Sequence, residues 1–87
     1  MHAVLIKVTI NDPEAGRKTL HEQVVPRVKQ APGFVAGYWT GTETKGQTIL
    51  IFESEQTANA MAETARDLAP PVVTLESIDV QEVVAHA

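Results

Sequence analysis

The chain contains no cysteine, which excludes disulfides, thiol catalysis and thiolate metal sites. No apolar run approaches the roughly 20 residues that a membrane-spanning helix needs. The first residues also lack the basic start and the long apolar segment of a signal peptide. These absences predict a cytoplasmic protein that does not interact with membranes.

Basic residues are few as well. Lysine and arginine number 7 against 11 aspartate and glutamate residues, which gives a net charge of -4, and both signs are scattered along the chain. Proteins bind phosphate backbones with concentrated basic patches. We therefore expect no nucleic-acid partner.

Motifs for metals and nucleotides are missing too. The histidines, His2, His21 and His86, are far apart, and the chain has neither a His-x-His nor a His-Glu-x-x-His motif. The 5 glycines show no phosphate-loop spacing. The sequence thus predicts no metal site and no cofactor.

The length of 87 residues predicts a single domain over residues 1–87, since no room remains for a second core. A domain this small buries only about 60% of the surface that its unfolded chain exposes. Association with a second copy would add burial and therefore stability.

The first half of the chain has the pattern of a strand followed by a helix. Apolar residues alternate over residues 3–10, which predicts a strand. Asp12 is a favoured N-cap and Pro13 a favoured first helical residue, and we expect the helix to reach about Gln30. Pro26 lies inside this helix and should kink or restart it.

A hairpin follows the first helix. Pro32-Gly33 ends the helix, because proline disfavours helical geometry before it and glycine accepts a left-handed turn. Two strands joined by a polar connection are predicted over residues 34–42 and 48–53. Side chains of the first strand alternate between its two sides. One side carries Phe34, Ala36, Tyr38 and Thr40, and the other carries Val35, Gly37, Trp39 and Gly41.

A second helix and a long strand complete the pattern. Ser54 is a favoured N-cap for a helix that reaches about Leu68 and is ended by Ala69-Pro70-Pro71. The last segment, residues 72–85, begins as a strand but is longer than an average strand. We therefore expect an irregularity near Asp79.

Apolar residues occupy both faces of the predicted strands, as Ile49 and Ile51 against Leu50 and Phe52 illustrate. Two helices cover only one face of a four-stranded sheet. The other face needs a partner. We expect two copies to pack face to face as a homodimer, with the long last strand helping to close it.

Three features together carry a family resemblance. They are the β-α-β-β-α-β order, the motif Pro32-Gly33-Phe34 before the second strand, and the strand over residues 48–53 followed by Ser54-Glu55 and an alanine-rich helix. With these features the chain resembles the dimeric α+β barrel superfamily, and within it the antibiotic biosynthesis monooxygenase-like proteins. The resemblance covers nearly the whole chain. It implies an α+β, ferredoxin-like fold with a four-stranded antiparallel sheet that forms a dimeric α+β barrel.

The superfamily that the chain resembles includes cofactor-independent quinol monooxygenases, haem-degrading enzymes, isomerases and members without a known reaction, so the fold does not choose among them. The resemblance implies a cofactor-free monooxygenase that acts on a small aromatic or quinol-type substrate. The alternative is a non-catalytic homodimer that binds a small molecule or another protein.

Arg17 and His21 are the unusual residues of the first helix. On a helical wheel they fall within the apolar arc of Leu20 and Val24, which faces the sheet. One interpretation is a pocket between helix and sheet, in which His21 is a catalytic base or a hydrogen-bond donor and Arg17 binds and neutralises an anionic ligand. The other is that Arg17 extends to water and His21 makes one backbone hydrogen bond.

Tyr38 and Trp39 are the only tyrosine and the only tryptophan. They point to opposite sides of their strand, so one cavity does not hold both unless the strand bulges. An aromatic wall suits a small planar ligand, which makes both residues candidates for ligand binding. Packing in the core or in a dimer interface is the alternative for each.

Overall fold

The computed structural model describes residues 1–68 and 73–87 of an α+β fold that is compatible with a ferredoxin-like arrangement. The expected helix stop at Ala69-Pro70-Pro71 lies outside these residues. In chain order the elements are the strand β1 (His2–Ile10), the helical segments α1 (Pro13–Thr19), η1 (Leu20–Val24) and α2 (Val25–Lys29), the strands β2 (Phe34–Gly41) and β3 (Lys45–Phe52), the helix α3 (Glu55–Leu68) and the strand β4 (Val73–Glu82).

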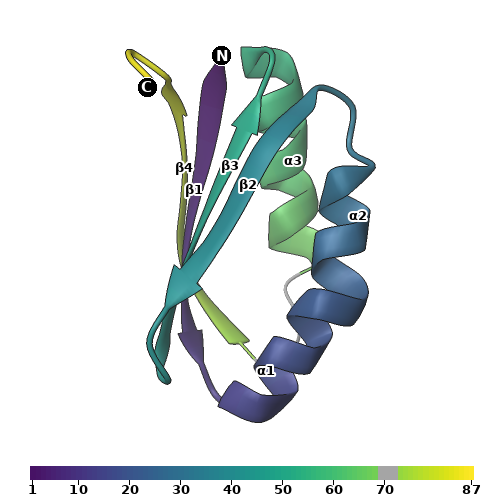
Figure 1. Ribbon diagram of the computed structural model, residues 1–87, viewed down its shortest axis with the longest axis vertical. Coiled ribbons are helices and arrows are strands. Elements are labelled where there is room, and N and C mark those ends of the chain that lie inside the picture. Colours follow the sequence, from purple (N-terminus) through teal and green to yellow (C-terminus); the bar gives the residue numbers. More distant parts are fainter. Residues whose placement is uncertain (69–72) are drawn as a thin grey trace.

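The strands form one antiparallel sheet in the order β2-β3-β1-β4, which confirms the predicted four-stranded antiparallel sheet. All the described helical segments lie on one side of this sheet (Figure 1). We call that side the covered face and the opposite side the bare face. Because residues on one strand alternate between these faces, the pairing register assigns each strand residue to one of them.

The first helix begins as predicted and is interrupted before Pro26. The Asp12 carboxylate accepts a hydrogen bond of 3.1 Å from the backbone N–H of Ala15. The segment η1 is a π-helical turn, closed by a hydrogen bond from the N–H of Val25 to the carbonyl of Leu20. Pro26 has no N–H to donate to the preceding turn, so the helix widens there and restarts as α2. The restart is confirmed, whereas the π-helical geometry is a finding of the structure.

A bulge in β2 corrects one prediction. The register with β3 shifts between Phe34 and Ala36, and the extra residue, Val35, is 49% exposed. Phe34 consequently pairs with Phe52 on the covered face, and the two rings meet edge to face with centroids 5.9 Å apart. The expectation that Phe34 shares a side with Ala36 and Tyr38 is wrong, because the bulge reverses the alternation.

The irregularity of β4 lies at Glu76, before the predicted position near Asp79. Lys7 on β1 pairs with Ser77, and the register shifts immediately after this pair, which leaves Glu76 as the extra residue. The strand is therefore bulged as expected, but at a different residue. The regular part of the strand also ends at Glu82, before the expected residue 85.

The hydrophobic core lies between the covered face and the segments α2 and α3. Val4, Leu50 and Phe52 of the sheet are between 0% and 1% exposed. Burial of side chains of this size stabilises the fold by about 1.5–3 kcal/mol each. The helix residues that complete the core are Val28, Ala58, Met61 and Ala62.

Gly33 and the first turn of α3 fix how the chain passes from the first helix to β2. The Ser54 hydroxyl accepts a hydrogen bond of 3.2 Å from the N–H of Thr57, which confirms the predicted cap. Gly33 has a φ of 77°, and a Cβ atom there would lie 2.7 Å from the Thr57 hydroxyl. Glycine is therefore required both by its left-handed backbone and by the close approach of α3.

Candidate functional site

The covered face is only partly closed around α1 and η1. The side chains of Val8 and Ile10 on β1 and of Trp39 on β2 remain half-buried, as does Val24 in η1. Thr48, which pairs with Trp39, is half-buried too. We call the sheet residues among them, Val8, Ile10, Trp39 and Thr48, the open half of the covered face. Small-molecule sites are mostly apolar with a few polar groups, so these residues form a candidate ligand surface.

Gly37, which has no side chain, leaves space for the Trp39 ring on the covered face. A Cβ atom at Gly37 would lie 3.1 Å from the Trp39 ring and 3.1 Å from the Leu50 side chain. A larger residue at this position would therefore require the indole or the Leu50 side chain to shift. The ring packs partly against the core and keeps one part exposed, as a wall for a planar ligand requires.

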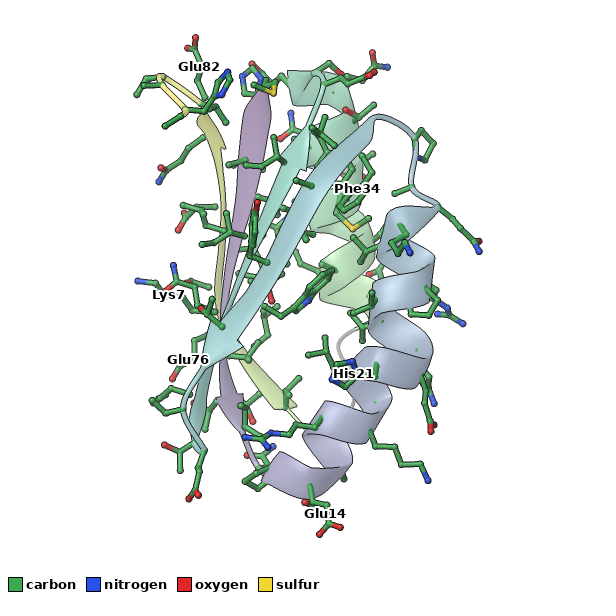
Figure 2. All side chains as sticks on the ribbon, in the orientation of Figure 1. Lys7, Glu14, His21, Phe34, Glu76 and Glu82 are labelled. Carbon is green, nitrogen blue, oxygen red and sulfur yellow. The ribbon has the colours of Figure 1, made fainter. Side chains whose placement is uncertain are left out.

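His21 lies within η1 and is exposed. Figure 2 shows its ring on the side of the helix that faces the sheet. Among the described residues, no hydrogen bond or ion pair holds the imidazole. The predicted orientation of His21 toward the sheet thus agrees with the view, and both ring nitrogens are available to a ligand.

Arg17 lies one turn earlier, in α1, and is also exposed. No hydrogen bond joins Arg17 to His21 within the described residues. The two side chains come from segments of different helical geometry, since α1 ends at Thr19 and His21 belongs to η1. A continuous helical wheel therefore does not describe their relation.

Tyr38 and Trp39 are separated by the sheet, as the alternation predicts. Trp39 pairs with Thr48 on the covered face, whereas Tyr38 pairs with Ile49 on the bare face and is 61% exposed. The structure thus places Trp39 on the same side as His21 and Tyr38 on the opposite side. A site between helix and sheet includes the indole and leaves out the phenol.

The bare face carries a polar cluster that sequence reasoning missed. The Lys45 ammonium lies 2.7 Å from the Glu76 carboxylate and donates to the Thr9 hydroxyl at 3.0 Å, and this hydroxyl donates to Glu76 at 2.8 Å. The hydrogen bonds from Lys45 and Thr9 hold the pKa of Glu76 below its ordinary value of 4.5. Figure 2 shows Glu76 and Lys7 projecting from the bare face.

The cluster borders a shallow hollow of about 260 Å³ at the end of the β2–β3 hairpin, lined by Lys7, Thr40, Gln47 and Glu76 among others. A second hollow, of about 530 Å³, lies along the outer surface of α3, lined by Glu55, Gln56, Asn59, Ala60 and Glu63. Both are open to solvent. Neither is lined by Arg17, His21, Tyr38 or Trp39.

No local pattern in the sequence predicts this polar cluster. Thr9, Lys45 and Glu76 come from three different strands, and the register with its bulge brings them together. Alternation alone does place Thr9 on the side of β1 opposite to Val4. It does not show which residues of β3 and β4 lie beside it.

The described residues contain no group of three or more side chains suited to hold a metal ion. Within the same residues, no helix has the length and apolar character needed to cross a membrane. No protein-family model and no curated protein matches the chain. The resemblance to the antibiotic biosynthesis monooxygenase-like proteins stays a prediction.

Proposed function

We propose that the chain is a cofactor-independent monooxygenase that acts on a small aromatic or quinol-type substrate. The observation that carries this proposal is the position of His21 on the sheet-facing side of the helix, on the same side of the sheet as the half-buried Trp39. Within the described residues its imidazole has no hydrogen-bond or ion-pair partner. In this arrangement Trp39 stacks on the aromatic ring and His21 contacts its hydroxyl group. Tyr38, on the bare face, has no part in the reaction.

The proposed chemistry needs a base and a dry apolar surface, because the electron-rich substrate itself reacts with oxygen. His21 takes the proton of a phenolic hydroxyl, and the phenolate donates electrons to O2, which adds to the ring. The oxygen–oxygen bond then breaks, leaving one oxygen on the ring as a quinone carbonyl. The other oxygen departs as water, with the displaced ring hydrogen and the proton that His21 returns. The Arg17 guanidinium stabilises the anion that forms.

The test is oxygen uptake with a panel of phenols and quinols. We expect uptake by the wild-type protein and a loss of about 100-fold or more in His21→Ala, since a positioned base contributes at least this much. The matched control is His86→Ala, which removes an exposed imidazole from the chain end. Equal uptake by His21→Ala and wild type would remove His21 from the mechanism.

We further propose that the bare face is covered by a second copy, which would complete a dimeric α+β barrel of β-α-β-β-α-β subunits. Leu5, Ile49 and Ile51 lie on this face, where no described element covers them. On the opposite face the helices bury Val4, Leu50 and Phe52 almost completely. A second copy on the bare face would cover its apolar side chains in the same way.

A non-catalytic dimer that binds a small aromatic molecule is the second candidate. It is favoured by the absence, within the described residues, of any side chain that orients His21. Catalytic imidazoles are usually held in place by a hydrogen bond to one ring nitrogen. Saturable binding of a quinol without oxygen consumption would select this candidate over the enzyme.

A further inference from the structure

One row of side chains crosses the bare face from edge to edge. Tyr38 on β2 pairs with Ile49 on β3, Ile49 pairs with Leu5 on β1, and Leu5 pairs with Asp79 on β4. Register partners have side chains on the same face, so the four form a continuous line. The row is apolar in its centre and ends in a phenol on one side and a carboxylate on the other.

The two ends of this row are polar side chains that reach solvent. Tyr38 is 61% exposed and Asp79 is exposed. Among the described residues, neither side chain has a hydrogen bond or an ion pair. The carboxylate of Glu76 on the same face differs, since the Lys45 ammonium lies 2.7 Å from it.

The ends of the row are complementary to each other. A phenolic hydroxyl donates a hydrogen bond, and a carboxylate accepts one. Ile49 and Leu5 are adjacent in the middle, so a two-fold axis that runs along the strands between β3 and β1 exchanges Ile49 with Leu5 and Tyr38 with Asp79. The row is therefore complementary to a second copy of itself.

We infer that a second copy of the chain stacks on the bare face about this axis, and that the Tyr38 hydroxyl donates a hydrogen bond to Asp79 of the partner subunit. The inference rests on the homodimer proposed above and specifies its register. Stacked sheets lie about 10 Å apart, a gap that a tyrosine and an aspartate side chain span together. The symmetry repeats the contact, so each dimer contains it twice.

The same axis avoids conflicts elsewhere on the face. In the next row Thr40 pairs with Gln47, Gln47 with Lys7, and Lys7 with Ser77. Exchange about the axis places Lys7 opposite Gln47 of the partner subunit. No lysine therefore faces a lysine, and the amide oxygen accepts from the ammonium.

A double-mutant cycle on the dimer dissociation constant tests this contact, measured by sedimentation equilibrium for the wild type, Tyr38→Phe, Asp79→Ala and the double variant. Each hydrogen bond to a carboxylate is worth about tenfold in affinity, and the dimer has two, so each single variant should dimerise about 100-fold more weakly. The double variant should be no weaker than the single ones. Asp67→Ala, an exposed carboxylate on α3, is the matched control and should leave dimerisation unchanged.

The outcomes separate this contact from the dimer itself. Wild-type protein that stays monomeric at high concentration overturns both proposals. A dimer that Leu5→Glu disrupts, but that Tyr38→Phe and Asp79→Ala leave unchanged, overturns only the register. A double variant whose loss of affinity equals the sum of the two single losses would also overturn the contact, because residues that do not interact have additive effects.

Discussion

The two faces of the sheet present similar residues to different surroundings. On the covered face Phe52 is 0% exposed under α3, whereas on the bare face Tyr38 is 61% exposed. Both faces carry branched apolar side chains in the same strands, such as Leu50 on one side and Ile49 on the other. The described helices cover one face only. Our proposals therefore assign ligand binding to the covered face and association with a second copy to the bare face.

The largest expected effect comes from truncating a matched pair across the sheet, Phe52→Ala and Ile49→Ala. Phe52→Ala should lower the free energy of unfolding by about 3–5 kcal/mol at every protein concentration, because it empties the core. Ile49→Ala should lower the free energy of unfolding by less in dilute solution. The stability of a dimer rises with protein concentration, and this rise should be weaker in Ile49→Ala. Urea unfolding at several protein concentrations measures both. If Ile49→Ala lowered the free energy of unfolding by the same amount at every protein concentration, the bare face would not serve association.

A smaller effect concerns the polar cluster of the bare face. The pKa of Glu76 is lowered in the folded chain, so the unfolded chain binds more protons as the pH falls through 4.5 and below. The cluster therefore stabilises the fold above the ordinary pKa and loses this contribution as the pH falls through the lowered one. Lys45→Ala should reduce the acid sensitivity of stability in this window.

Unfolding by urea at pH 7 and at pH 3 measures that sensitivity. Lys29→Ala is the matched control, because Lys29 is an exposed lysine at the end of α2 and takes no part in the cluster. An equal pH dependence for Lys45→Ala and wild type would show that the ion pair does not contribute. The effect is expected to be small, since both groups are exposed and screened by solvent.

Much of the fold was predictable because its signals are local. Asp12 and Ser54 cap helices through neighbouring backbone groups, and Gly33 ends the first helix by its own conformation. Alternation placed Trp39 and Tyr38 on opposite faces without any knowledge of their partners. These elements depend on a few consecutive residues, and the sequence shows such residues directly.

The remaining features depend on contacts between distant segments. The bulges at Val35 and Glu76 arise from how neighbouring strands pair, and each moves side chains to positions that alternation within one strand does not give. The π-helical turn at His21 depends on how the helix accommodates Pro26. For this reason the approximate positions of Arg17 and His21 could be predicted, but not their separation into two helical geometries.

The measurement that tests the candidate site most directly uses Trp39, the only indole of the chain. Its fluorescence is titrated with a quinol, corrected for absorbance, in wild type, His21→Ala and the control His86→Ala. We predict saturable quenching in wild type and His86→Ala, and binding weakened about tenfold in His21→Ala, where one hydrogen bond to the ligand is lost. Quenching that does not saturate, or that is identical in all three proteins, would contradict a site between His21 and Trp39.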